Sequence, residues 1–446
     1  MTSFPTTALD LQRVQRRTVL VLSSAQLLSG IGNGATLSVG SLLAVQLSGS
    51  DAWAGSVTTI MTLGTAVAAM PLAGLAGRRG RRVGLMTGLL AGLAGALLVV
   101  ASTVAASFFL LLAGSALLGI ATAANLQARF AAVDLAEPEQ RGRSLAIVVW
   151  AVTAGAVAGP NLIKPGAVLG EALGLPAISG PFLFSVAGLF LAAVLIAVGL
   201  RPDPLLYAAE RRRVDLAAAG APPAVLKRQS LRHGLRAVRD SPKAMMALAA
   251  IVTAHACMAA VMSMTPLHLQ ILGEQGTSGG GHDHSMGTDA FALIGFTISL
   301  HIAGMYALSP LMGWLTDRVG RTATIMMGHG LIFAATACAG FGAGTPALVT
   351  VGLVLLGLGW SAATIAGSTL LAESVQEGDR VLVQGVSDTL MSAAGAVGAG
   401  SAGLVLSWIG YQGLNMVALG AAGMVLALVL AMAIRERQAA PVSFSG

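Results

Sequence analysis

Charged and aromatic residues are both scarce in this chain. Asp, Glu, Lys and Arg make up only 10% of its 446 residues and Phe, Trp and Tyr only 4%, whereas 55% are hydrophobic. Soluble globular proteins carry roughly 25% charged residues, so this composition excludes a water-soluble fold of this size. It predicts a membrane protein with many spanning segments, as does the mean hydropathy of +0.80.

Cysteine pairs and catalytic motifs are also missing. The chain has only two cysteines, Cys257 and Cys338, and both fall inside apolar runs, so no disulfide framework is expected. The sequence contains no phosphate-binding loop, no zinc-type His/Cys spacing and no nucleophile–base pair. It therefore predicts neither an enzyme nor a permanently bound cofactor.

Basic residues follow a regular pattern along the chain. All but two of the 26 Lys and Arg residues fall at the termini or in alternate loops, the exceptions being Arg129 and Lys164. This positive-inside pattern predicts a cytoplasmic (inner) membrane protein with both termini in the cytoplasm, and it explains the high pI without a nucleic-acid partner. Residues 6–17 are polar and the run after them is long enough to stay as a helix, so no cleavable signal peptide is expected.

Hydropathy predicts twelve spans in two groups of six, separated by the basic, partly amphipathic stretch 202–242. The sequence thus predicts an all-α membrane protein with six-helix halves at 1–201 and 243–446, joined by a cytoplasmic linker at the lipid surface. The predicted spans are 18–47, 53–76, 83–104, 107–132, 144–163, 178–200, 243–270, 291–316, 322–343, 346–372, 381–408 and 411–434.

The two halves repeat each other. GLAGRRGRRVG (74–84) follows the second span and GWLTDRVGRTA (313–323) follows the eighth, with their loop glycines 240 residues apart. The loops after the fourth and tenth spans also match, since Arg141 and Arg380 are 239 residues apart. Duplicated six-helix units are typical of transporters that bind substrate between their repeats.

GWLTDRVGR resembles the signature loop of the major facilitator superfamily, and GAVAGPN (155–161) resembles its Gly-Pro motif. The resemblance covers the full chain and implies two pseudo-symmetric halves that alternate access to the substrate. It also implies a cytoplasmic gate, in which the first loop has Gly77 where an Asp is expected. The gating candidates are Asp317, Arg318, Arg321 and Arg380.

Histidine and methionine recur at helical spacing in two neighbouring predicted spans. His255, Met258 and Met262 share one face of the seventh span, and His301 and Met305 lie one turn apart in the eighth. Thioethers favour Cu(I), and imidazole suits copper in either oxidation state. Neither pair is specific alone, because methionine also fills gaps in helix packing. Ordinary packing around a hydrogen-bonded histidine is the alternative.

The predicted outer loop 273–289 carries further candidate ligands. His282, His284 and Met286 lie in a Gly/Ser-rich tract that leads directly into the eighth span. Short His-rich tracts often bind metal, and a simply solvated loop is the alternative. Together with His255, these three residues are the candidate accessory metal ligands.

MAAVM (258–262) and HIAGM (301–305) together resemble the CcoA-like copper importers, a branch marked by Met-x-x-x-Met in the seventh helix and His-x-x-x-Met in the eighth. The resemblance implies an importer with copper as substrate and Met258, Met262, His301 and Met305 as ligands. The protein is expected to be a monomer in membrane lipid. The resemblance leaves Cu(I) and Cu(II) open. The alternatives are a proton-coupled exporter of drug-like molecules and a membrane metal sensor or chaperone.

Several other polar residues fall inside the predicted spans. Asp388 is the candidate for proton coupling, with a helix cap or an ion pair to Arg380 as the alternative. Arg129 is expected to snorkel or to pair with Asp134. The residues that could line a central cavity are Gln26, Asn33, Asn125 and Arg129.

Overall fold

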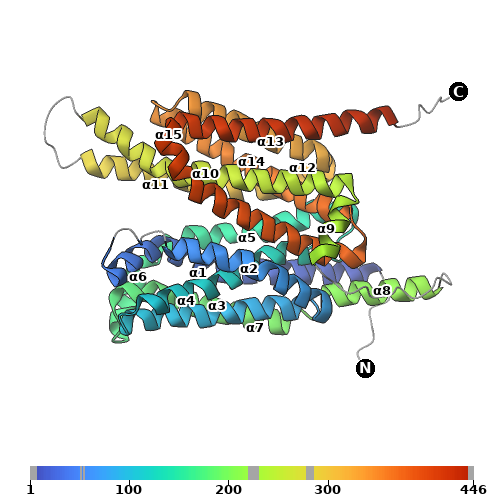
Figure 1. Ribbon diagram of the computed structural model, residues 1–446. Coiled ribbons are helices and arrows are strands. Elements are labelled where there is room, and N and C mark those ends of the chain that lie inside the picture. The colour runs from blue at the N-terminus through green and yellow to red at the C-terminus, as the bar shows by residue number, and fades with distance from the viewer. Residues whose placement is uncertain (1–7, 51–52, 54–55, 219–230, 278–285, 440–446) are drawn as a thin grey trace. The chain divides into compact units, whose positions relative to one another are not determined.

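The protein is all-helical, as expected. A computed structural model describes residues 8–50, 53, 56–218, 231–277 and 286–439, and these contain helices and no strand (Figure 1). Nine stretches of this part of the chain are long and apolar enough to cross a membrane. One of them, Glu377–Met432, contains two predicted spans, and α1 and α5 lie at the other two predicted positions. Every predicted span therefore lies in a helical part of the chain.

The described residues form two compact units. The first unit combines residues within Met1–Ser241 with Val375–Ala393, and the second combines Pro242–Ser374 with residues within Ala394–Gly446. The helices of the first unit are α1 (Ala8–Ser48), α2 (Ser56–Arg79), α3 (Arg81–Val104), α4 (Phe108–Ala131), α5 (Arg141–Asn161), α6 (Ile163–Ala172), α7 (Gly180–Gly199), α8 (Pro204–Ala218) and α9 (Leu231–Arg239).

The second unit contains the remaining long helices, and α15 passes from the first unit into it. The helices of the second unit are α10 (Pro242–Thr277), α11 (Met286–Tyr306), α12 (Ser309–Arg318), α13 (Arg321–Phe341), α14 (Pro346–Glu373) and the greater part of α15 (Glu377–Ala439). The predicted halves 1–201 and 243–446 are defined by the repeat in the sequence. The two packing units are defined by contacts and therefore do not test those halves.

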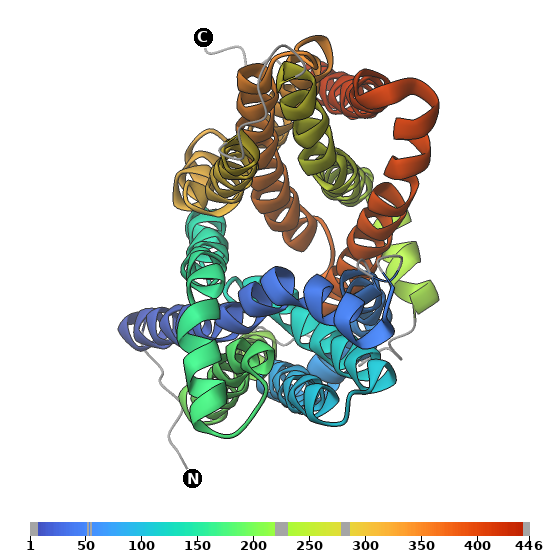
Figure 2. The same cartoon turned by 90° about the vertical axis from the view of Figure 1, so that its left-hand side faces the viewer.

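Helix boundaries differ from the predicted spans where glycine or proline interrupts the backbone. The predicted eighth span consists of two helices, since α11 ends at Tyr306 and α12 begins at Ser309. Pro310 lies in the first turn of α12, where proline is favoured. The eleventh and twelfth predicted spans form the single long α15, which breaks at Gly410, where φ is 69° and ψ is −179°. This break is the sharp bend between the two red segments in Figures 1 and 2.

The repeated loops adopt the same backbone conformation. Gly80 lies between α2 and α3 with φ at 93°, and Gly320 precedes α13 with φ at 106°. Only glycine adopts this left-handed region without steric cost. The 240-residue repeat found in the sequence is therefore a repeat of structure, with an arginine directly after each glycine.

Small residues allow the helices of the first unit to pack closely. α3 and α4 lie side by side, and a Cβ added at Gly95 would lie 2.7 Å from the carbonyl oxygen of Gly114. Membrane helices cannot use the exclusion of water to hold them together, so close van der Waals contact at small residues is their main attraction. The abundance of glycine in the sequence thus has a direct packing role.

The two linker helices attach to the beginning of α15 within the first unit. His233 of α9 lies 2.8 Å from the Asp379 carboxylate, and Arg212 of α8 pairs with Glu377. Gly234 faces the side chain of Leu382. The stretch predicted as a linker is therefore packed and partly helical along its described length.

Candidate functional site

His301 of α11 is fully buried and is held by one hydrogen bond. Its Nδ1 lies 2.7 Å from the carbonyl oxygen of Leu353 in α14. Because a carbonyl oxygen only accepts, Nδ1 carries the proton and Nε2 of the neutral ring carries the lone pair. Nε2 is buried and has no hydrogen-bond partner among the described residues. Metal-ligating histidines in proteins are oriented in this way, by a carbonyl or carboxylate at the other nitrogen.

The methionines predicted to join His301 lie in the same unit. Met258 and Met305 are 7% and 6% exposed and belong to one apolar cluster, and Met262 packs against that cluster. Their helices α10 and α11 are in contact with each other, and both pack on α14. The structure thus brings together the three helices that carry and orient the predicted ligands.

A glycine in α14 allows α11 to approach at this point. A Cβ at Gly357 would lie 2.5 Å from the carbonyl oxygen of His301 and 3.0 Å from the amide nitrogen of Met305. Gly304 makes the reciprocal approach, since a Cβ there would lie 2.9 Å from the carbonyl oxygen of Val354. The HIAGM motif therefore contains the small residue that its own helix crossing requires.

His255 has the opposite proton arrangement. The indole N–H of Trp360 donates to its Nδ1 over 3.0 Å, and an indole nitrogen cannot accept. Nε2 of the neutral His255 ring must therefore carry the proton, beside Gly395, where a Cβ would lie 2.8 Å away. While this bond holds, neither nitrogen of His255 offers a lone pair to a metal, which does not favour its predicted accessory role.

The other accessory candidates cannot be placed. His282 and His284 lie outside the described residues, as does the side chain of Met286 at the start of α11. In the part of the chain that the structure describes, no three His, Cys, Asp or Glu side chains gather into a metal cluster. The candidate site therefore depends on one imidazole and the thioethers.

A second buried histidine provides a comparison. His329 in α13 is also fully buried, with Nδ1 3.2 Å from the carbonyl oxygen of Ile325 and no partner for Nε2 among the described residues. Its bond is to its own helix, whereas that of His301 joins two helices. His329 is therefore the natural control for the function of a buried imidazole.

Two of the gating candidates of the second unit, Asp317 and Arg321, lie in one charged cluster. Arg321 lies 3.1 Å from Glu373 and 3.6 Å from Asp317, and it also donates to the carbonyl oxygen of Thr316. Arg318 lies over the ring of Trp314, 5.9 Å from its centroid. Asp317 and Arg321, two gating candidates from the repeated loop, thus lie against each other.

The first unit repeats this arrangement with residues that the sequence analysis did not select. Arg81 is 1% exposed and binds Asp134 through two hydrogen bonds of 2.8 and 3.1 Å. Arg81 and Arg321 are 240 residues apart, and Asp134 and Glu373 are 239 apart. The same register that matched the loops predicts this pairing, so it could have been found from the sequence.

Arg81 also contacts the beginning of α15. Its Nη2 donates to the side-chain oxygen of Gln384 over 2.6 Å. Arg380, the fourth gating candidate, lies one turn earlier in α15, among the charges of Arg81, Asp134 and Glu377. Each unit therefore has a charged cluster with an arginine at its centre, Arg81 in the first and Arg321 in the second.

Arg129 and Asp388 form a buried ion pair in the first unit. Their closest nitrogen and oxygen atoms are 2.6 Å apart, and the side chains are 3% and 0% exposed. The expected partners were wrong for both residues: Asp134 is bound by Arg81, and Asp388 is bound by Arg129 of α4. Oδ2 of Asp388 and Nε of Arg129 have no hydrogen-bond partner among the described residues.

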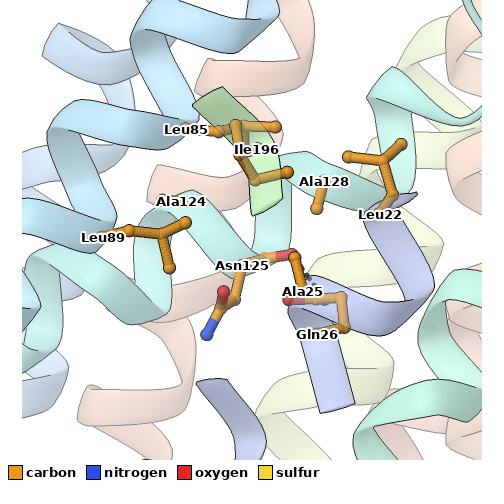
Figure 3. Close-up of a pocket in the computed structure, with 9 residues that line it drawn as sticks. All are labelled: Leu22, Ala25, Gln26, Leu85, Leu89, Ala124, Asn125, Ala128 and Ile196. Atoms are coloured by element: carbon orange, nitrogen blue, oxygen red, sulfur yellow. Dashed lines mark hydrogen bonds between the residues drawn. The ribbon is translucent and has the colours of Figure 1, made fainter. Parts of the chain in front are cut away.

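A small pocket lies among α1, α3, α4 and α7 of the first unit. The amide group of Gln26 donates to the backbone oxygen of Asn125 over 3.0 Å at its edge (Figure 3). The cavity measures about 10 Å³, which is no more than a single water requires. The side chain of Asn33 is not described. Gln26 and Asn125 bind each other here and leave no space for an organic substrate.

The fold and these buried charges define a class, that of helical membrane transporters with internally repeated halves. The chain belongs to the Major Facilitator Superfamily, whose family pattern matches residues 22–282 and 283–446. It is accordingly a secondary transporter and not an enzyme, as predicted.

Three relatives match the chain over nearly its full length. The uncharacterized MFS-type transporter YdeG of Bacillus subtilis is 34% identical, covering 93% of this chain and 90% of its own. A second B. subtilis protein with the same description, YddS, is 33% identical over 94% of this chain and 90% of its own. The riboflavin transporter RfnT of Brucella anthropi is 26% identical over 90% of this chain and 92% of its own.

Solved structures confirm the major facilitator fold. The human organic anion transporter MFSD10 has a TM-score of 0.67 at 18% identity, covering 93% of this chain and 99% of its own. The Escherichia coli fucose:proton symporter FucP has a TM-score of 0.64 at 17% identity, covering 92% and 97%. These similarities concern the fold alone.

We expect Gly357→Ala to destabilise the protein, because the new Cβ would meet backbone atoms of α11 that cannot rotate away. The loss should be about 1–3 kcal/mol, visible as a lower unfolding temperature of the detergent-purified protein. Gly330→Ala in α13 is the matched control, since a Cβ there meets no atom within 4 Å. Equal unfolding temperatures for both variants would contradict the close approach of α11 and α14.

We expect Arg129→Leu to destabilise the protein more than the double variant Arg129→Leu with Asp388→Leu. Removing one partner leaves a buried charge uncompensated and costs about 3–5 kcal/mol, whereas removing both leaves none. The same thermal unfolding measurement tests this order. If the double variant is the less stable of the two, the pair contributes through packing and not through charge compensation.

Proposed function

We propose that the protein imports copper across the cytoplasmic membrane by alternating access, with both termini in the cytoplasm. The observation that carries the proposal is the buried Nε2 of His301, which offers a lone pair and has no protein partner among the described residues. Leaving a buried nitrogen unpaired costs free energy. A metal ion that binds there during transport gives this arrangement a function.

The thioethers provide the rest of the proposed ligand set. Met305 follows His301 by one turn of α11, and Met258 and Met262 follow each other by one turn of α10. All three methionines belong to or pack against one cluster in the second unit. Thioethers bind soft ions such as Cu(I) and bind hard ions poorly. Neutral ligands also hold the ion weakly enough for release, which transport requires.

An organic substrate is the second candidate. It is favoured by the similarity to RfnT, which is described as a riboflavin transporter and aligns with 90% of this chain. The proposed copper ligands would then be packing residues around a histidine. The two candidates differ in what Met→Leu substitutions do, because leucine nearly conserves volume but cannot bind a metal.

Asp388 is the residue that we propose for proton coupling. One of its oxygens binds Arg129, and Oδ2 is buried without a partner among the described residues. A proton on Oδ2 would neutralise the carboxylate and weaken its attraction to Arg129. Binding and release of that proton would therefore alter the packing of α4 against α15 within the first unit.

We expect His301→Gln and Met305→Leu to lower copper uptake into proteoliposomes by roughly tenfold or more, as expected when a metal site loses a ligand. His329→Gln and Met264→Leu are the matched controls, a buried histidine and a methionine of α10 outside the proposed site, and both should retain uptake. Uptake that survives in all four variants, or is lost equally in all four, would contradict the copper site. Riboflavin uptake that is unaffected by the two site variants would support the second candidate.

We expect the double variant Arg129→Gln with Asp388→Asn to lose the dependence of uptake on a proton gradient. The two amides can keep a hydrogen bond between α4 and α15 without leaving a buried charge, so the variant should fold. The measurement compares uptake with and without an imposed pH difference across the proteoliposome membrane. A gradient effect equal to that of the unmodified protein would assign coupling to another residue.

A further inference from the structure

The charges around the candidate site in the second unit restrict the ion that it can hold. We propose that the transported species is a monovalent soft cation, Cu(I), and that Cu(II) and Zn(II) are excluded. This inference rests on the proposed function and specifies its substrate. It follows from the absence of an anionic ligand near His301 in the part of the second unit that the structure describes.

The described carboxylate side chains of the second unit are already bound elsewhere. They are Asp317 and Glu373, and both lie against Arg321, at 3.6 and 3.1 Å. Glu373 ends α14, thirteen residues after Trp360 of the methionine cluster, which is roughly 20 Å along a helix. Neither carboxylate can therefore reach the site to compensate the charge of an ion.

The thiol next to Met258 is also bound elsewhere. Cys257 directly precedes Met258, is 4% exposed, and donates its S–H to the carbonyl oxygen of Ala418 over 3.6 Å. This contact directs the sulfur of Cys257 toward the backbone of α15. The chain's other cysteine, Cys338, lies in α13 and not on α10 or α11. Neither cysteine therefore belongs to the proposed ligand set.

A histidine binds a metal only as a neutral ring. His301 donates from Nδ1 to Leu353, and His255 accepts at Nδ1 from Trp360. The proposed ligands are therefore one neutral imidazole and three thioethers, with a total charge of zero. The ion itself would bring the only net charge into this buried region.

The desolvation energy of an ion rises with the square of its charge, so a divalent ion pays about four times as much as a monovalent one of equal size. Binding to neutral thioethers compensates little of the desolvation energy of a divalent ion. The same thioethers bind the soft, weakly hydrated Cu(I) well. The ligand set therefore discriminates by charge as well as by softness. Ag(I), which is soft, monovalent and stable to oxidation, should behave as Cu(I) does.

Selectivity for Cu(I) means that Cu(II) must be reduced before it is transported. Copper that arrives as Cu(II) must first gain one electron, Cu(II) + e⁻ → Cu(I), from a one-electron donor outside this protein. The reaction class that supplies the substrate is therefore the reduction of cupric ion on the side of the membrane from which copper is taken up.

The test measures uptake by the full-length protein in proteoliposomes, with four probes offered separately at equal concentration. These are Cu(I) kept reduced with ascorbate, Cu(II) without reductant, Ag(I) and Zn(II). We expect Cu(I) and Ag(I) to accumulate and to compete with each other, and Cu(II) and Zn(II) to accumulate at least tenfold less. Uptake of Cu(I) and Ag(I) should fall in the Met305→Leu variant and persist in Met264→Leu.

A variant that changes the charge of the ligand set tests the inference independently. Met262→Asp adds one anionic ligand at the least buried position of the set, and it should lower Ag(I) uptake and raise Zn(II) uptake. Met264→Asp places the same charge two residues along α10 and should leave the ratio of Zn(II) to Ag(I) unchanged. Size-exclusion profiles identify variants that fail to fold, and for these the comparison of probes on the unmodified protein decides.

The outcomes separate this inference from the proposed function. Uptake of Cu(II) or Zn(II) equal to that of Cu(I), and dependent on Met305, would overturn the charge argument and leave metal transport standing. Failure to take up any of the four probes would overturn the proposed function, and this inference with it. Preference for Cu(I) and Ag(I) that depends on Met305 supports both.

Discussion

A charge inside a membrane protein is tolerated only when an opposite charge lies against it, and the interior of this transporter follows that constraint. Arg81 binds Asp134, Arg129 binds Asp388 and Arg321 binds Glu373, so each of these three arginines has a carboxylate against it. Helix positions follow from these pairs, because a helix that moved away would leave an arginine uncompensated. The proposed metal ligands satisfy the same constraint in another way, since thioethers and a neutral imidazole carry no charge.

The repeat produces the same ion-pair arrangement in both halves of the chain. A loop with a glycine in the left-handed conformation and an arginine after it occurs twice, and each arginine binds a carboxylate at or just after the end of the second helix that follows. The pair of Arg129 and Asp388 has no counterpart in this repeat, since residue 369, which is 240 positions after Arg129, is a threonine. An asymmetry of this kind is what distinguishes the two halves of a transporter whose scaffold is otherwise duplicated.

Much of the fold could be predicted from the sequence, because hydropathy and the 240-residue repeat are properties of the chain alone. The helix positions, the glycine turns and the grouping of Met258, Met262, His301 and Met305 on neighbouring helices all depend on such local patterns. The partner of Asp388 could not be predicted, because it depends on how α4 packs against α15, more than 250 residues later. The continuity of α15 through its break at Gly410 depends on packing in the same way.

The chemistry of the candidate site could be predicted only in part. Spacing identifies which side chains share a helix face, but the proton of an imidazole is placed by its hydrogen-bond partner. Leu353 and Trp360 are apolar or aromatic residues of α14 that carry no sequence signal for that function. Only the structure shows that they assign opposite roles to His301 and His255.

The nitrogen resonances of His255 can consequently serve as an internal reference for those of His301. In His301 the proton lies on Nδ1 and in His255 on Nε2, so the nitrogen resonances of the two rings differ before any ion is added. An ion bound at the proposed site would perturb the unprotonated Nε2 of His301, while the ring of His255, which accepts from the indole of Trp360, would keep its signal. Occupancy and conformational response can thus be read separately within one spectrum.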